Sequence, residues 1–80
     1  MNFPFQLYTK SGHSVLVTNI APGVFYFEGQ GPNGHPIKFK YIDKSLAEND
    51  NQREPKIQQS FSGVEMEILG VFIKQRELNR

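Results

Sequence analysis

The chain has 80 residues, a formal net charge of +1 and no cysteine. A chain of this length has room for one small core, so residues 1–80 are predicted to form a single small β domain. The lack of cysteine excludes disulfides and cysteine-based zinc sites as sources of stability. The small net charge neither requires nor excludes an acidic partner.

The apolar content relies on aromatic rings, with seven Phe, three Tyr and no Trp. Each ring buries a large area, which suits a small core. No apolar run approaches the roughly 18 residues that a membrane span needs. Residues 1–5 also lack the basic region and apolar stretch of a signal peptide. The sequence therefore predicts a cytoplasmic protein that makes no membrane contact.

Apolar and polar residues alternate along most of the chain. Ile37, Phe39 and Tyr41 alternate with Lys38 and Lys40, which is the period of a strand with one buried face. Two segments carry apolar residues at both odd and even positions, a pattern typical of strands that are covered on both faces. These two are 14–20 and 24–28. The strands predicted in this way are 3–8, 14–20, 24–28, 37–42, 56–61 and 64–74.

Turn residues separate the first four predicted strands. The turns contain Ser11-Gly12, Pro22-Gly23 and Asn33-Gly34, and glycine readily adopts the positive φ that tight hairpins require. Because these connections are short, the first four strands are predicted to form an antiparallel meander.

The second half of the chain is less regular. Residues 43–56 are predicted to be a flexible charged connection, and Ser45-Leu46-Ala47-Glu48 has the pattern of a capping box. One short helical turn is therefore predicted near 45–53. In the last strand the apolar parity changes at Gly70, which predicts a bulge or bend there. Residues 75–80 are predicted to be a frayed tail.

Together these elements predict an all-β, or mostly β, fold. The expected architecture is a small antiparallel barrel or a strongly bent sheet of five to six strands, because closure removes exposed strand edges. The alternative is an open sheet with the short helix across one face, which would leave a surface free and favour a dimer.

The candidate catalytic and metal-binding residues are few. His13 and His35 each follow a turn glycine, so they can lie at the same end of the sheet, where Asp43 could complete a metal site. The chain has no His-x-x-x-His spacing, and we interpret both histidines as solvated loop residues. Glu65 and Glu67 share one face of a predicted strand, and we interpret them as partners of lysines on a neighbouring strand.

The glycine-rich segment 29–34 does not have the features of a phosphate-binding loop. It contains no Lys-Ser/Thr pair and precedes a predicted strand rather than a helix. The sequence therefore predicts a protein that is not an enzyme and that binds no cofactor and no metal.

Two hypotheses for function remain. The first is a non-catalytic protein-interaction or assembly domain, which binds a protein or peptide partner or forms a homodimer. The second is a small β-barrel that binds single-stranded nucleic acid weakly, because basic residues interleaved with rings suit such binding. The second is not favoured, because alternation along 37–42 places lysines and rings on opposite faces and the sequence pI of about 8.1 is low for this class. The candidate binding residues are Tyr8, Tyr26, Lys38, Lys40 and Tyr41.

Overall fold

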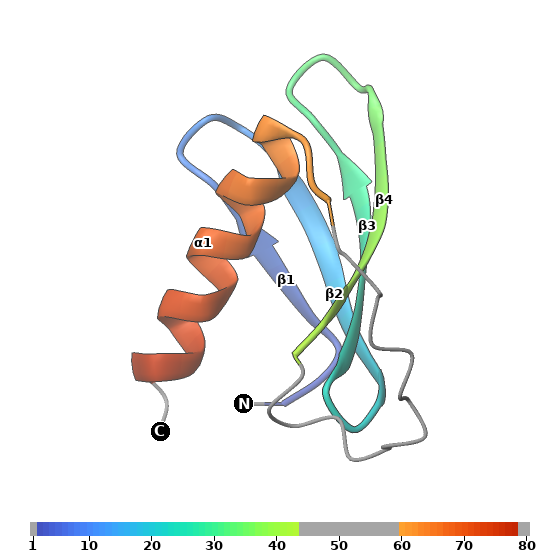
Figure 1. The fold of residues 1–80 in the computed structure, drawn as a ribbon. Helices are drawn as coiled ribbons and strands as arrows, with labels where there is room; N and C mark the ends of the chain where they lie inside the picture. The colour runs from blue at the N-terminus through green and yellow to red at the C-terminus, as the bar shows by residue number, and fades with distance from the viewer. Residues whose placement is uncertain (1, 44–59, 79–80) are drawn as a thin grey trace.

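A computed structural model describes residues 2–43 and 60–78 of the chain. This part of the protein consists of a four-stranded antiparallel sheet followed by one helix (Figure 1). Each strand pairs with the next one along the chain, in the order β1-β2-β3-β4, so the predicted meander is confirmed. The elements are β1 (Phe5–Tyr8), β2 (Ser14–Ala21), β3 (Val24–Gln30), β4 (Pro36–Ile42) and α1 (Gly63–Leu78).

Glycines shape both the turns and the close approach of β2 to β3. Each of the three hairpin turns contains a glycine with positive φ, as the turn motifs predict. Gly29 has a different role, because it lies opposite Val15 within the sheet. A Cβ atom at Gly29 would collide with the carbonyl oxygen of Ser14, so the two strands leave no room for a side chain at this position.

The strand register divides the side chains into two faces. On the inner face, Phe5, Val17, Phe27 and Phe39 form one row across the four strands. On the outer face, the register gives rows that alternate with the inner ones. The outer-face residues in the regular part of the register are Gln6, Tyr8, Ser14, Leu16, Thr18, Tyr26, Glu28, Gln30, Lys38 and Lys40.

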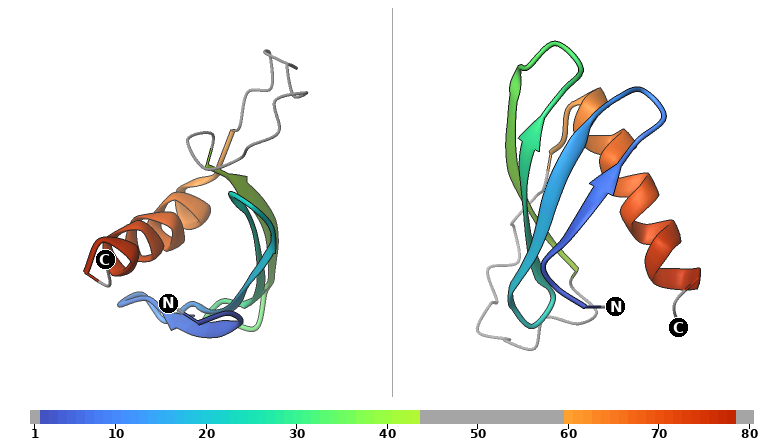
Figure 2. Two further views of the ribbon diagram at one scale, coloured as in Figure 1. Left: turned by 90° about the horizontal axis from the view of Figure 1, so that it is seen from below. Right: turned by 180° about the vertical axis from the view of Figure 1, so that it is seen from behind.

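The sheet is bent, and α1 lies along its concave side (Figure 2). The helix buries Ile68, Leu69 and Phe72, which are spaced i, i+1 and i+4 and therefore lie on one helical face. These three side chains complete a core with the inner face of the sheet.

Phe72 is the centre of an aromatic cluster. Its ring is fully buried and its centroid lies 5.0 Å from that of Phe25 and 5.2 Å from that of Phe27, both in edge-to-face geometry. Phe5 and Tyr41 contact the same ring from the two edge strands, at 6.3 Å and 6.5 Å. Phe72 therefore joins three of the four strands, β1, β3 and β4, through ring contacts.

Two polar contacts fix the ends of α1. Ser62 and Glu65 form a reciprocal capping box, in which Glu65 N donates to Ser62 Oγ (3.2 Å) and Ser62 N donates to Glu65 Oε1 (2.9 Å). Near the other end, Arg76 donates to Asp43 Oδ2 at 3.0 Å. The Arg76 guanidinium also lies over the rings of Phe25 and Phe72, where cation–π attraction favours it.

The predicted strand 64–74 is wrong, and so is the bulge predicted at Gly70. These residues belong to α1. The alternation of Val64, Met66 and Ile68 imitates a strand because Val64 and Met66 are exposed apolar residues on a helix. The capping box at Ser62–Glu65 is the sequence signal that indicates the helix instead.

The closed barrel is also wrong, because the sheet is open and α1 covers its concave side. Five to six strands are not confirmed in the described residues. Ser60 and Phe61 are not in a strand, and the rest of the predicted strand 56–61 lies outside the described residues. The predicted helical turn near 45–53 and most of the connection 43–56 also lie outside them. Residues 75–78, predicted as part of a frayed tail, form the last turn of α1.

Candidate functional site

The outer face of the sheet combines exposed rings with lysines. Tyr8 is 67% exposed, and the half-buried Tyr26 lies directly opposite Lys40 on the neighbouring strand. Lys38 is exposed two residues before Lys40 on the same face. The described residues place no element over this face; α1 lies on the other side of the sheet (Figure 2). The rings and cations are therefore accessible together.

Four of the five predicted binding residues thus share one surface. The expected separation of lysines and rings holds within β4, where Tyr41 points to the inner face and lies near Phe61, Phe25 and Phe72. It does not hold for Tyr8 and Tyr26, because these rings lie on other strands whose register brings them to the lysine face. Alternation within one strand gives no information about the facing of its neighbours.

The environment of Tyr41 affects its acidity. Partial burial raises the pKa of the Tyr41 hydroxyl above its ordinary value of 10.0, and the carboxylate of Asp43 raises this pKa further. The positive charge of Arg76 acts in the opposite direction. The neutral phenol is thereby favoured beside the aromatic cluster.

Charge is distributed unevenly between the two sides of the described residues. The outer face carries Lys38 and Lys40 and one carboxylate, Glu28, which lies opposite Lys38 in the register. The side chains of α1 include more carboxylates than cations, and Arg76 is paired with Asp43. Although the net charge of the chain is only +1, the outer face of the sheet is therefore more positive than α1. The charged residues of α1 are Glu65, Glu67, Glu77, Lys74 and Arg76.

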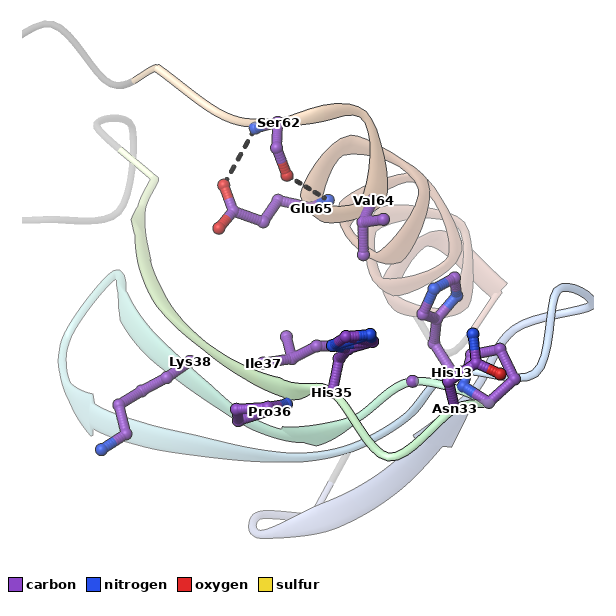
Figure 3. A pocket seen from close by; sticks show the side chains of 11 residues that line it. His13, Asn33, His35, Pro36, Ile37, Lys38, Ser62, Val64 and Glu65 are labelled. Atoms are coloured by element: carbon purple, nitrogen blue, oxygen red, sulfur yellow. Dashed lines mark hydrogen bonds between the residues drawn. The ribbon is translucent and has the colours of Figure 1, made fainter.

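Beside the end of the sheet, a cleft of about 450 Å³ separates the β3–β4 turn from the first turn of α1. Both histidines line it, together with Asn33, Ile37 and Val64. Figure 3 shows the two imidazole rings, which come from different turns, on the side of the sheet that faces the helix. The prediction that the histidines lie at the same end of the sheet is thus confirmed, and His13 is not a solvated loop residue.

Several contacts fix the ring of His13. Its side chain is only 11% exposed, and Nδ1 lies 3.1 Å from Thr9 Oγ1 and 3.7 Å from Glu67 Oε1. Ser11 Oγ donates to the other oxygen of Glu67 at 2.7 Å. A Cβ atom at Gly31 would lie 3.3 Å from Cδ2 of the same ring. The β1–β2 turn, the β3–β4 turn and α1 therefore all contact His13.

Glu65 and Glu67 are not a pair on a strand. On a helix, residues two apart point in different directions, and the two carboxylates have separate partners: Glu65 caps α1, whereas Glu67 contacts Ser11 and His13. The cross-strand partner of Lys38 is Glu28 instead. Residues 2–43 and 60–78 contain no group of three or more His, Cys, Asp or Glu side chains suited to a metal ion.

The solvent side of α1 is a further surface with exposed apolar side chains. Met66 is 61% exposed and Ile73 is 38% exposed. Gly70 lies between them, and a Cβ atom there would meet nothing within 4 Å. Ile73 follows Met66 by seven positions, so the two side chains lie on the same helical face.

In the part of the chain that the structure describes, the helix lacks the length and apolar composition needed to cross a membrane. In comparisons with models of protein families, with curated proteins and with solved structures, the chain matches none of them. Function must therefore be inferred from the surfaces described above.

Proposed function

We propose that this chain is a non-catalytic binding domain whose outer sheet face binds single-stranded nucleic acid. The observation that carries this proposal is the presence of Tyr8 and Tyr26 on the same open face as Lys38 and Lys40. Single-strand binders combine rings on which bases stack with cations that neutralise the phosphates. The outer face has both within one sheet.

The distance between the two rings suits two different bases. Tyr8 and Tyr26 are two strands apart across the sheet and four residues apart along it, so their Cα atoms are separated by about 16 Å at ordinary strand spacing. A nucleic-acid strand that stacks one base on each of these two rings would cross the β-sheet diagonally. It then reaches β4, where Lys40 lies next to Tyr26 and can contact a phosphate.

The excess of lysines on the outer face opposes burial of this face against a second copy of the chain. A face-to-face pair would bury two copies of Lys38 and Lys40 with only two of Glu28. Removing an excess of cations from water is costly unless each finds a partner. A polyanion supplies those partners.

The proposal is tested with fluorescein-labelled oligothymidylate and oligouridylate of about 10 nucleotides, a length within the range covered by small β domains. Fluorescence anisotropy of the full chain at low salt measures Kd. Tyr26→Ala is expected to weaken binding roughly fivefold or more through lost stacking. Lys40→Glu is expected to weaken binding and to reduce the slope of log K against log salt by at least about 0.7.

Lys74→Glu is the matched control, since it makes the same change of charge at an exposed position of α1. This variant is expected to bind nearly as well as the wild type. An absence of association at low salt refutes the proposal. Equal losses in Lys40→Glu and Lys74→Glu also refute it, because they would show a dependence on total charge alone.

A second candidate is the assembly domain, and the solvent side of α1 favours it. Two α1 helices crossing in antiparallel fashion at Gly70 would place Met66 and Ile73 in one symmetric contact, and the lack of a side chain at Gly70 permits close approach. Sedimentation velocity over a hundredfold dilution tests this candidate. Met66→Glu is expected to abolish any dimer, whereas Leu16→Glu on the outer face leaves it intact. A wild-type monomer throughout the dilution contradicts it.

A further inference from the structure

The cleft beside the β3–β4 turn is continuous with the outer face. Lys38 lines the cleft and also belongs to the outer-face row that contains Glu28. Pro36 lines the cleft as well, and it lies opposite Gln30 at the end of the sheet. Lys38 and Pro36 therefore connect the outer face to the mouth of the cleft at the β3–β4 turn end of the sheet. In Figure 3 the ammonium group of Lys38 points away from the two histidines, which leaves the space between them to an uncharged group.

The walls of the cleft suit a flat ring with polar edges. Its volume of about 450 Å³ lies in the range of small-molecule sites. Ile37 and Val64 supply apolar walls, and His35 is an exposed imidazole at the end of the hairpin on which a base can stack. Asn33 adds an amide that both donates and accepts hydrogen bonds.

His13 supplies a polar group whose position is already fixed. The carboxylate of Glu67, 3.7 Å from Nδ1, favours the tautomer that carries its proton on Nδ1. Nε2 is then the acceptor, and it lies on the side of the ring near Gly31, which also lines the cleft. A ring that enters the cleft thus meets an acceptor held in place by contacts from the β1–β2 turn and α1, so little conformational freedom is lost on binding.

We propose that the cleft receives one unstacked nucleobase, which lies against His35 and forms hydrogen bonds with His13 and Asn33. This inference rests on the proposed function of the outer face, from which the bound strand extends. It predicts base selectivity, because hydrogen bonds to base edges distinguish bases, whereas stacking on Tyr8 and Tyr26 tolerates any base.

The test uses the four ribonucleoside monophosphates on the ¹⁵N-labelled full chain, with chemical shifts recorded by NMR. At least one mononucleotide is expected to shift the resonances of Gly31, Asn33 and His35, and His35→Ala is expected to remove these shifts. His35→Ala is also expected to weaken oligonucleotide binding roughly fivefold or more and to reduce the differences in Kd among homopolymers. Because His35 is exposed, this variant should fold normally, which circular dichroism verifies.

Ribose 5-phosphate and inorganic phosphate are the ligand controls, and Tyr8→Ala is the protein control. Tyr8→Ala should weaken oligonucleotide binding while leaving the mononucleotide shifts unchanged. If either phosphate control produces the same shifts, or if oligonucleotides bind His35→Ala as tightly as the wild type, the nucleobase site is refuted while the outer-face proposal stands. If mononucleotides bind the cleft but no oligonucleotide binds, the outer-face proposal is refuted and the cleft remains a site for free nucleotides.

Discussion

At the scale of single residues, Gly29 is the position in the sheet that least tolerates a side chain. Replacing it with alanine drives a Cβ atom into the Ser14 carbonyl oxygen and places it 2.6 Å from Val15 Cα, and both of these are backbone atoms that cannot rotate away. The strands must therefore separate. We expect Gly29→Ala to lower the free energy of unfolding by about 3 kcal/mol or more, in the range of severe single substitutions. Urea denaturation measures this change, and a loss below about 1 kcal/mol would contradict it.

Tyr41 predicts an alkaline limit to stability. Burial raises the pKa of its hydroxyl above 10.0 in the folded chain, so the unfolded chain loses this proton first as the pH rises. The stabilisation is complete below pH 10 and is lost as the pH rises through the folded pKa. We expect Tyr41→Phe to flatten the fall of unfolding free energy above about pH 10. Urea denaturation at a series of alkaline pH values compares the two proteins, and parallel curves would show that Tyr41 does not cause the decline.

The binding residues also show which side-chain positions can be predicted from the sequence of one β-strand and which cannot. The lysines of β4 are correctly predicted as exposed, because the period of two separates them from Phe39 and Tyr41. The facing of Tyr26 relative to Lys40 depends on the register between β3 and β4, which alternation does not specify. The cleft is less predictable still, because the contact between His13 and Glu67 joins residues 54 positions apart through the placement of α1.

At the scale of elements, the four described strands follow from alternation and turn chemistry, whereas α1 is hidden by its composition. A helix that exposes Val64, Met66 and Ile73 has apolar side chains on more than one face, so its period is obscured. Local capping is the better signal here. Ser62-Gly63-Val64-Glu65 has the same S-x-x-E spacing as Ser45-Leu46-Ala47-Glu48, and good helix formers follow it.

The stability of α1 can be changed from both its first turn and its middle. Ser62→Ala removes the hydroxyl that accepts from Glu65 N and is expected to lower the free energy of unfolding by about 1 kcal/mol. Gly70→Ala is expected to raise it by up to about 1 kcal/mol, because glycine is a poor helix former and the added methyl group meets nothing within 4 Å. Thermal denaturation followed at the helix signal measures both changes. A rise in the free energy of unfolding for Ser62→Ala, or a fall for Gly70→Ala, would contradict these expectations.

At the scale of the whole molecule, the core depends on one ring from the helix. Phe72 contacts Phe5, Phe25, Phe27 and Tyr41, so truncating it leaves a cavity at the meeting point of sheet and helix. Phe72→Ala is expected to cost about 3–5 kcal/mol, enough to unfold much of a domain this small. Phe72→Leu, which fills part of the space, should cost less and keep a measurable urea transition. Met66→Ala, at an exposed position of the same helix, is the control and should change stability little.

The position of α1 after the sheet in the chain has a consequence during synthesis. Phe72 lies thirty positions after Ile42, the end of β4, and a ribosome needs about 2 to 6 seconds to add these residues. During that interval all four strands have been made while their ring-bearing concave surface still lacks its cover. A sheet with such a surface can associate with other chains until α1 packs against it, so chaperone demand should fall once the helix is in place.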